Sequence, residues 1–381
     1  LFEKINILMK LIYKYKLIIT FLLTLVAITS VFKAFIDAQV ISFDFHFSPT
    51  KLVSEGINHY QYILEGNHDH GPNDKIMYEQ NGVYAQGLFV LLLPLTYLDW
   101  DQAKLVWSLI NIIIGILLPI LICKKFSLNK FETFMVTSIF LSSTIFRIHI
   151  GYGQQTLLSY LFFIFPFLFN SKLSSIFSGI SYFKFNIGYV LFFYFLSELN
   201  FKKLVLSILP LVVGWLLYSF ITDTNIFINL FEPLKLILYW DSDKAFPVTI
   251  FSLLKKFNFP NLSVLIIPLI INFILIIKIK HIKDNLLKLS LISLSAICFM
   301  PHQLHDYVLL LPLLIYSVKN FNLFLSKINL LFVFYFFFIL RIVSFFFNIQ
   351  PWEFPYNLWG YFNNLICLII LSYNYLLLKK K

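Results

Sequence analysis

Long apolar runs fill most of this chain, and short polar segments separate them. The runs do not alternate with a period of two, and many approach the ~20 residues that a helix needs to cross a bilayer. Only helices and closed barrels satisfy their backbone in lipid, so runs of this kind predict helices. The predicted spans are 12–34, 101–122, 132–149, 156–170, 174–184, 185–198, 204–221, 261–280, 286–300, 307–318, 328–348 and 358–378. The sequence therefore predicts an all-α, polytopic transmembrane helical bundle of about twelve spans, forming a single domain over residues 1–381.

Composition supports a membrane protein and changes the meaning of the charge. Hydrophobic residues make up 59% of the chain and charged residues 13%, so the apolar surface exceeds what one soluble core can hide. The net charge of +11 would indicate nucleic-acid binding in a soluble protein. Here the lysines instead cluster in short connections between apolar runs, as the positive-inside rule describes. We therefore expect both termini in the cytoplasm, no nucleic-acid partner, and, because Lys, Ile, Asn and Phe are abundant, the cytoplasmic membrane of a bacterium with an A+T-rich genome.

This topology places residues 35–100 outside as a first extracytoplasmic loop. Within the loop, the apolar run 86–98 is too short to span, which predicts a juxtamembrane helix in the outer interface. The runs 174–184 and 185–198 are also short, and Lys184 falls between them. One continuous helix would bury that lysine near the middle of the membrane, so we predict two half-length helices with Lys184 at their apex, facing a cavity.

Candidate chemistry gathers on the outer side, beginning with Asp44 in the stretch "FDFHF". This carboxylate follows the first span by about ten residues in an aromatic setting. Partial desolvation there would make it a better general base. An ordinary solvated loop aspartate is an equal alternative.

Two groups of imidazoles also lie on that side. His302, His305 and Asp306 end a span after a proline, where they could orient a phosphate or a sugar hydroxyl or simply cap a helix. The "HDH" stretch at 68–70 offers metal-ligand types, but a Gly-Pro-Asn-Asp turn follows it directly, which favours a solvated loop tip.

The two arginines, Arg147 and Arg341, are both predicted near outer ends of spans. A guanidinium suits bidentate binding of a phosphate, whereas snorkelling to the interface is the alternative. Arg147 is the stronger candidate, because the Gly- and Gln-rich turn 151–155, which includes Gln154, makes the same region polar.

Five short landmarks follow one another along residues 1–310. They are Asp44 with Gly56 and Tyr60; Tyr84, "LLLPL", Ala103 and Trp107; Gly153-Gln154; Gly179 and Lys184; and His305-Asp306. In this order they resemble the GT-C type integral membrane glycosyltransferases, specifically the polyprenyl-phosphate-mannose-dependent glycosyltransferase family 87. Two positions depart from the family pattern: Tyr84 begins Tyr-Ala-Gln rather than Tyr-Pro-Pro, and Phe185 stands where a proline usually follows the lysine.

The resemblance implies an extracytoplasmic active site that uses a polyprenyl-phosphate sugar, with mannose or another hexose or pentose, as donor. It implies inversion at the anomeric carbon and a cell-envelope glycan or glycolipid as acceptor. Carried over by position, Asp44 would be the catalytic base. The substrate-binding candidates are Tyr60, Tyr84, Arg147, Gln154, Lys184, His302, His305 and Asp306. No nucleotide or organic cofactor is expected, and a divalent metal is left open.

Two other functions fit the same polar residues. A transporter or flippase of lipid-linked sugars would use the cavity to move its cargo, but the polar groups here cluster on one side, which favours an enzyme facing that side. An oligosaccharide polymerase or ligase would act on a diphosphate lipid. Such proteins concentrate basic residues in a large late external loop, which this chain carries only thinly at Lys244, Lys255 and Lys256.

Overall fold

The computed structural model describes residues 14–42, 46–66, 84–239, 254, 261–300, 302–339, 342 and 358–379. Every regular element among these residues is a helix, as the apolar runs predicted. The α-helices are α2 (Lys16–Ile41), α3 (Phe47–Ser54), α4 (His59–Leu64), α5 (Gln86–Leu92), α6 (Trp100–Lys125), α7 (Lys130–Ser142), α8 (Thr144–Gly151), α9 (Thr156–Leu168), α10 (Lys172–Ser178), α11 (Phe185–Ser197), α12 (Phe201–Ile221), α13 (Ile226–Tyr239), α15 (Asn261–Ile279), α16 (Asn285–Phe299), α17 (Leu311–Lys319), α18 (Phe324–Phe334) and α20 (Leu358–Lys379). The 3₁₀-helices are η1 (Leu93–Tyr97), η2 (Gly179–Phe183) and η3 (Leu304–Leu310), and η4 (Tyr335–Ile339) is a π-helix.

Among the described residues, three helices are long and apolar enough to cross a membrane: α2, α6 and α12. The pair α7 and α8 becomes a fourth if the two are one span, bent by 55°. Large apolar side chains cover the outside of the three long helices, as at Phe21, Ile113 and Phe220. Such a surface is expected where lipid rather than water is the solvent. The chain therefore has the helices of a membrane protein.

The prediction of about twelve spans is not matched among the described residues. Several predicted spans are short apolar helices, including α9 and α11 with 13 residues each. At ~1.5 Å per residue such a helix reaches about 20 Å, less than the ~30 Å of a bilayer core. The first span also differs, because α2 continues to Ile41 instead of ending at residue 34. Lys33 and Asp37, one helical turn apart, pair at 2.7 Å and carry the helix past the predicted end.

The apolar run 86–98 is helical, as predicted, and forms α5 followed by η1. One face of α5 packs closely on α12. A Cβ atom on Gly214 of α12 would lie 2.4 Å from the Cα atom of Gly87, so only glycine permits the two backbones to approach this far. The helix therefore rests on protein on that side, while Leu91 and Tyr97 are exposed on the other.

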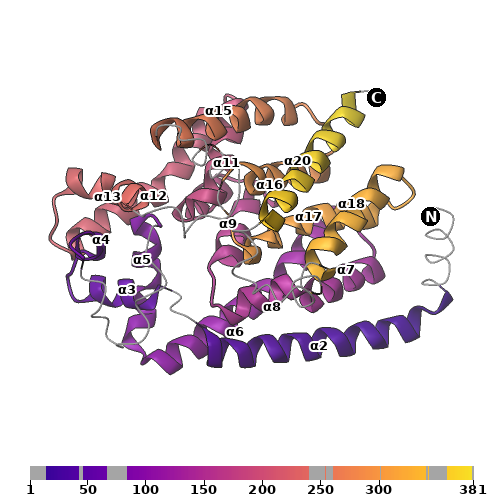
Figure 1. The fold of residues 1–381 in the computed structure, drawn as a ribbon, viewed down its shortest axis with the longest axis horizontal. Helices are drawn as coiled ribbons and strands as arrows, with labels where there is room; N and C mark the ends of the chain where they lie inside the picture. The colour runs from indigo at the N-terminus through magenta and orange to yellow at the C-terminus, as the bar shows by residue number, and fades with distance from the viewer. Residues whose placement is uncertain are drawn as a thin grey trace.

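Helices α3, α4, α5 and α13 gather at one end of the molecule, on the left of Figure 1. No predicted span lies between residues 221 and 261, so α13 is a helix that the sequence analysis missed. Its polarity is reversed relative to a soluble surface helix. Asn229 and Glu232 are buried against α4 and α12, whereas Phe227 and Phe231 are exposed.

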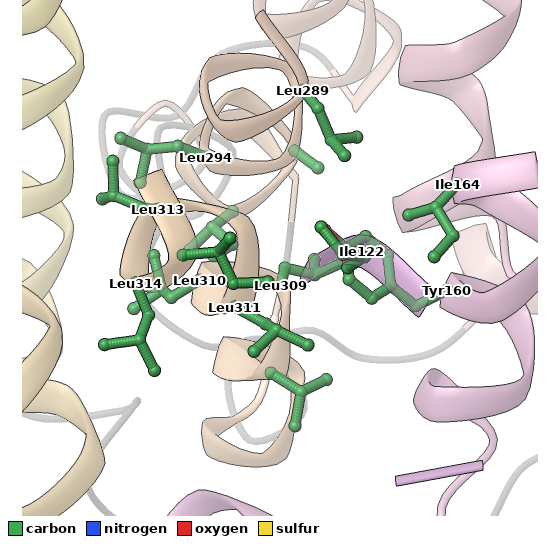
Figure 2. Close-up of a cluster of buried hydrophobic side chains, with 14 of the residues drawn as sticks. Ile122, Tyr160, Ile164, Leu289, Leu294, Leu309, Leu310, Leu311, Leu313 and Leu314 are labelled. Atoms are coloured by element: carbon green, nitrogen blue, oxygen red, sulfur yellow. The ribbon is translucent and has the colours of Figure 1, made fainter. Parts of the chain in front are cut away.

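The largest apolar cluster among the described residues includes side chains of α6, α7, α8, α9, α11, α16 and α17 together with η3. Figure 2 shows part of it, in which leucines of η3 and α17, among them Leu309 and Leu310, lie in one cluster with Leu294 of α16 and Tyr160 of α9. Because η3 carries His305 and Asp306 at its start, this core fixes the position of the polar residues described next.

Candidate functional site

A buried ion pair joins Lys184 to Asp306. The distance from Lys184 Nζ to Asp306 Oδ1 is 3.0 Å, and the two side chains are 1% and 2% exposed. Burying two charges is expensive unless they pair and take further hydrogen bonds. Such a pair therefore marks a place where the fold tolerates a costly arrangement.

Lys184 is presented by a break between two short helices. It lies between η2 and α11 with an extended backbone, and its N–H donates to the Ser181 carbonyl. Gly188 lets the chain fold back this tightly, because a Cβ atom there would lie 2.5 Å from the Cα atom of Tyr182. The predicted break at Lys184 is confirmed, with α10 and η2 before the lysine and α11 after it; the lysine, predicted to face a cavity, is buried in the ion pair with Asp306.

Asp306 is held by donors on both carboxylate oxygens. Oδ1 accepts from Thr156 Oγ1 as well as from Lys184, and His305 Nε2 lies 3.5 Å away. Oδ2 lies 3.0 Å from His302 Nδ1 and accepts from the Gln303 backbone N–H. With donors on each oxygen, the carboxylate form is the one that this site stabilises.

Thr156 and Tyr84 complete the contacts of Lys184. The lysine Nζ donates to Thr156 Oγ1 at 2.9 Å and to the Tyr84 hydroxyl at 3.3 Å. Tyr84 is half-buried, and its backbone carbonyl accepts from the hydroxyl of Tyr60. Burial, with Tyr218 and Glu232 nearby, raises the pKa of Tyr60 well above its ordinary value, so this phenol keeps its proton and remains a donor.

Two further buried imidazoles border this cluster. The ring of His46 packs edge-on against Tyr84, with ring centroids 4.8 Å apart. The ring of His149 lies 6.1 Å from that of His305. In both His46 and His149, Nδ1 has no hydrogen-bond partner within the part of the chain that the structure describes.

A second polar network links the first loop to α13. The Glu232 carboxylate accepts from Asn58 Nδ2 at 2.7 Å and from Gln61 Nε2 at 2.6 Å. The Tyr218 hydroxyl bonds Asn58 and the Nδ1 atom of His59. Since Tyr60 follows in the same short helix, this network fixes the wall from which Tyr60 reaches Tyr84.

Most of the predicted binding residues meet in one place. Tyr84, Lys184, His302, His305 and Asp306 meet in one buried cluster, which we call the Lys184–Asp306 cluster, and Tyr60 contacts its edge.

Arg147 and Gln154 are not brought into the Lys184–Asp306 cluster within the described residues. Arg147 is half-buried on α8, and Gln154 bonds the Tyr152 carbonyl. Asp44, Arg341 and the "HDH" stretch at 68–70 lie outside the described residues.

The landmarks around these residues are also in contact. Trp107 Nε1 donates to the carbonyl of Gly153 at 2.8 Å, which joins the second landmark to the third. Gly153 has a positive φ of 62°, as a tight turn at this point requires.

Sequence reasoning missed Thr156, His46, His149 and the Asn58–Glu232 contact. Thr156 starts an apolar helix directly after the "GYGQQ" turn, a position that usually means only a helix start. His46 lies in the same "FDFHF" stretch as Asp44, and a search for polar residues flanked by aromatics would have found it.

No group of three or more His, Cys, Asp or Glu side chains that could hold a metal ion occurs among the described residues. Among the described residues, Asp306, His302 and His305 are joined by ion-pair and hydrogen-bond contacts. Comparison of the chain with known protein families, curated proteins and solved structures finds no match.

Proposed function

We propose that this protein is a GT-C-like membrane glycosyltransferase. It transfers mannose or another hexose or pentose from a polyprenyl-phosphate donor to a cell-envelope glycan or glycolipid. We place it in the cytoplasmic membrane of a bacterium, with both termini inside and the reaction at the outer face.

One observation carries the proposal more than the others. His46, two residues after Asp44, packs on Tyr84, and Tyr84 accepts a hydrogen bond from Lys184. The segment that follows the proposed base thus contacts Tyr84, which bonds the lysine of the buried ion pair. Four segments far apart in the chain contribute Tyr84, Thr156, Lys184 and Asp306 to one place, and convergence of this kind is typical of a site.

The proposed reaction is a displacement at the anomeric carbon. The acceptor oxygen forms a bond to that carbon on the face opposite the phosphate, and the bond from the carbon to the phosphate oxygen breaks. Asp44 takes the acceptor hydroxyl's proton, and the bonding electron pair leaves with the polyprenyl phosphate. A general base placed in this way contributes about 10²–10⁴-fold in rate.

The Lys184–Asp306 cluster fits a positioning task beside this chemistry. Its charges are paired, and its hydrogen bonds fix the Tyr84 hydroxyl and the Thr156 hydroxyl. Groups held this rigidly reduce the entropy lost when a substrate is oriented. In the predicted topology the polar groups cluster on one side of the membrane, which also favours an enzyme over a transporter.

The test uses proteoliposomes with radiolabelled polyprenyl-phosphate mannose, tried beside glucose, galactose and arabinose forms, and a cell-envelope lipid extract. Wild type should release label from the donor to an acceptor, and Asp44→Asn should lower the rate at least 100-fold, as loss of a general base predicts. Asp101→Asn is the matched control, because Asp101 is 88% exposed and pairs only with its neighbour Lys104 among the described residues.

Three outcomes would count against the proposal. Undiminished transfer by Asp44→Asn would move the base elsewhere. Wild type that transfers no sugar from any of these donors would end the glycosyltransferase assignment. Movement of the intact lipid between leaflets, without transfer, would establish a flippase instead.

A further inference from the structure

His46 combines three unusual features. Its side chain is 4% exposed, and its Nδ1 atom has no hydrogen-bond partner among the described residues. Its backbone has φ 68° and ψ 26°, in the left-handed region that non-glycine residues rarely adopt. Buried polar atoms are normally paired, and left-handed backbone is normally avoided, so a residue that breaks both rules points to a function.

The backbone of His46 is held in place by the helix that it precedes. Its carbonyl accepts from the Thr50 N–H at 3.1 Å and from Thr50 Oγ1 at 2.6 Å. The strained conformation is therefore fixed from both the main chain and a side chain. A ring anchored in this way keeps its orientation when no ligand is present.

The His46 ring belongs to the aromatic side of the Lys184–Asp306 cluster. It contacts the Tyr84 ring edge-on, and the Phe89 ring is also oriented edge-on, with ring centroids 6.2 Å apart. Tyr84 is half-buried and bonds Lys184 through its hydroxyl. The unpartnered nitrogen thus belongs to a buried ring that is one side chain away from the ion pair.

The charge state of His46 limits what it can bind. Burial, helped by the positive charge of Lys184, lowers the pKa of His46 to about 3, so the ring is neutral at physiological pH. In a neutral imidazole, Nδ1 either donates or accepts, depending on the tautomer. A sugar hydroxyl fits both cases, because it donates and accepts, whereas the phosphate diester of a lipid-linked sugar only accepts.

Lys184 does not supply a free positive charge beside His46, because Asp306 already pairs with it at 3.0 Å. A neutral ring nitrogen, the hydroxyl of Tyr84 and an aromatic wall are usual parts of a site for a polyhydroxy ring. We propose that His46 Nδ1 binds a hydroxyl of the transferred sugar, and that this side of the Lys184–Asp306 cluster receives the sugar ring rather than the phosphate. The assignment rests on the proposed function and names the part of the substrate that this site holds.

The test measures equilibrium binding of radiolabelled undecaprenyl phosphate and of its mannose, glucose, galactose and arabinose forms to the protein in nanodiscs. His46→Phe keeps the ring but removes both nitrogens, and it should weaken the preferred sugar-bearing lipid about tenfold while leaving bare undecaprenyl phosphate unchanged, as expected for one lost buried hydrogen bond. His46→Asn should recover most of the affinity, since its amide reaches the Nδ1 position and Asn tolerates the left-handed backbone. His281→Phe, at an exposed histidine, controls for the substitution itself.

Each result decides something. Equal binding of the preferred sugar lipid by wild type and His46→Phe would show that the nitrogen is satisfied by water alone and would overturn the assignment. Equal weakening of both lipids would mean that His46 serves the phosphate or only the packing. If wild type binds no sugar-bearing lipid better than the bare phosphate, the glycosyltransferase proposal fails as well.

A measurement on the wild-type protein covers the case in which His46→Phe does not fold. With ¹⁵N-labelled histidine, the Nδ1 resonance of His46 should shift on addition of the preferred sugar lipid and stay in place with bare undecaprenyl phosphate. A resonance that responds equally to both lipids, or to neither, would refute the assignment.

Discussion

Removing the negative charge of Asp306 should destabilise the protein far more than its small chemical change implies. At an effective dielectric constant of about 20, two unit charges separated by the 3.0 Å of this pair attract by roughly 5–6 kcal/mol. The shape of the side chain is kept in Asp306→Asn, and the amide oxygen retains part of this interaction. Loss of one partner from a buried pair therefore leads us to expect a loss of about 3–5 kcal/mol in the free energy of unfolding.

The two halves of the pair should not respond equally. In Asp306→Asn, Lys184 keeps only the neutral hydroxyls of Thr156 and Tyr84 among its described contacts. In Lys184→Met, Asp306 keeps the Thr156 hydroxyl, His302 and the Gln303 N–H. The aspartate variant should thus lose more stability than the lysine variant, and the double variant should lose clearly less than the sum of the two.

The assay is reversible denaturant titration in lipid–detergent micelles, followed by fluorescence of the six tryptophans. Asp101→Asn, which breaks a pair whose carboxylate is 88% exposed, is the control and should lose no more than about 1 kcal/mol. Additive losses in the double variant, or a loss in Asp306→Asn no larger than in the control, would refute the electrostatic account of this pair.

Three further outcomes follow from other parts of the fold. Gly214→Ala should destabilise the protein by about 1–3 kcal/mol, because the added Cβ atom would lie 2.4 Å from the backbone of α5. Gly115→Ala should be milder, because its Cβ atom would meet a phenylalanine ring rather than backbone, and thermal unfolding of the two variants compares them. Asn329→Ala breaks both 2.8 Å hydrogen bonds between the amides of Asn329 and Asn374. A double-variant cycle with Asn374→Ala should give a coupling energy of about 0.6–2 kcal/mol, and zero coupling would contradict a role for this pair in joining α18 to α20. Burial lowers the pKa of His46 to about 3, below the ~6.5 of a histidine in the unfolded chain, so as pH falls the unfolded state gains a proton that the folded state does not bind. The free energy of unfolding of wild type should therefore fall by about 1 kcal/mol from this residue between pH 7 and pH 5.5. Unfolding titrations in which His46→Asn shows the same pH dependence would contradict this.

The helical class and several helix positions could be read from the sequence because they depend on local runs of residues. Helices α6 and α12 lie close to their predicted ranges, and the break at Lys184 follows from placing one charge in a long apolar stretch. The count of spans could not be read in this way. Whether a 13-residue helix such as α9 or α11 counts as a span depends on how it packs with its neighbours, which hydropathy does not contain.

The site was predictable to the extent that unusual residue types identify it. Lys184, His302, His305 and Asp306 stand out in apolar surroundings, and they do meet. Thr156 does not stand out, because a threonine at a helix start is ordinary, and only the packing of α9 on η3 brings it to the carboxylate. Glu232 looked like one acid among many until α13 was seen to turn it inward onto Asn58.

The order in which the ion pair is completed has a consequence for synthesis of the protein in the cell. Thr156 and Lys184 emerge from the ribosome long before Asp306, which is 150 residues beyond Thr156. Until η3 is synthesised, Lys184 cannot pair with Asp306. An unpaired charge among apolar helices is the kind of defect that membrane quality control recognises. A nascent chain halted before Asp306 should therefore be degraded sooner than one halted after α17, and completion of the site would coincide with the step at which the chain becomes stable in the membrane.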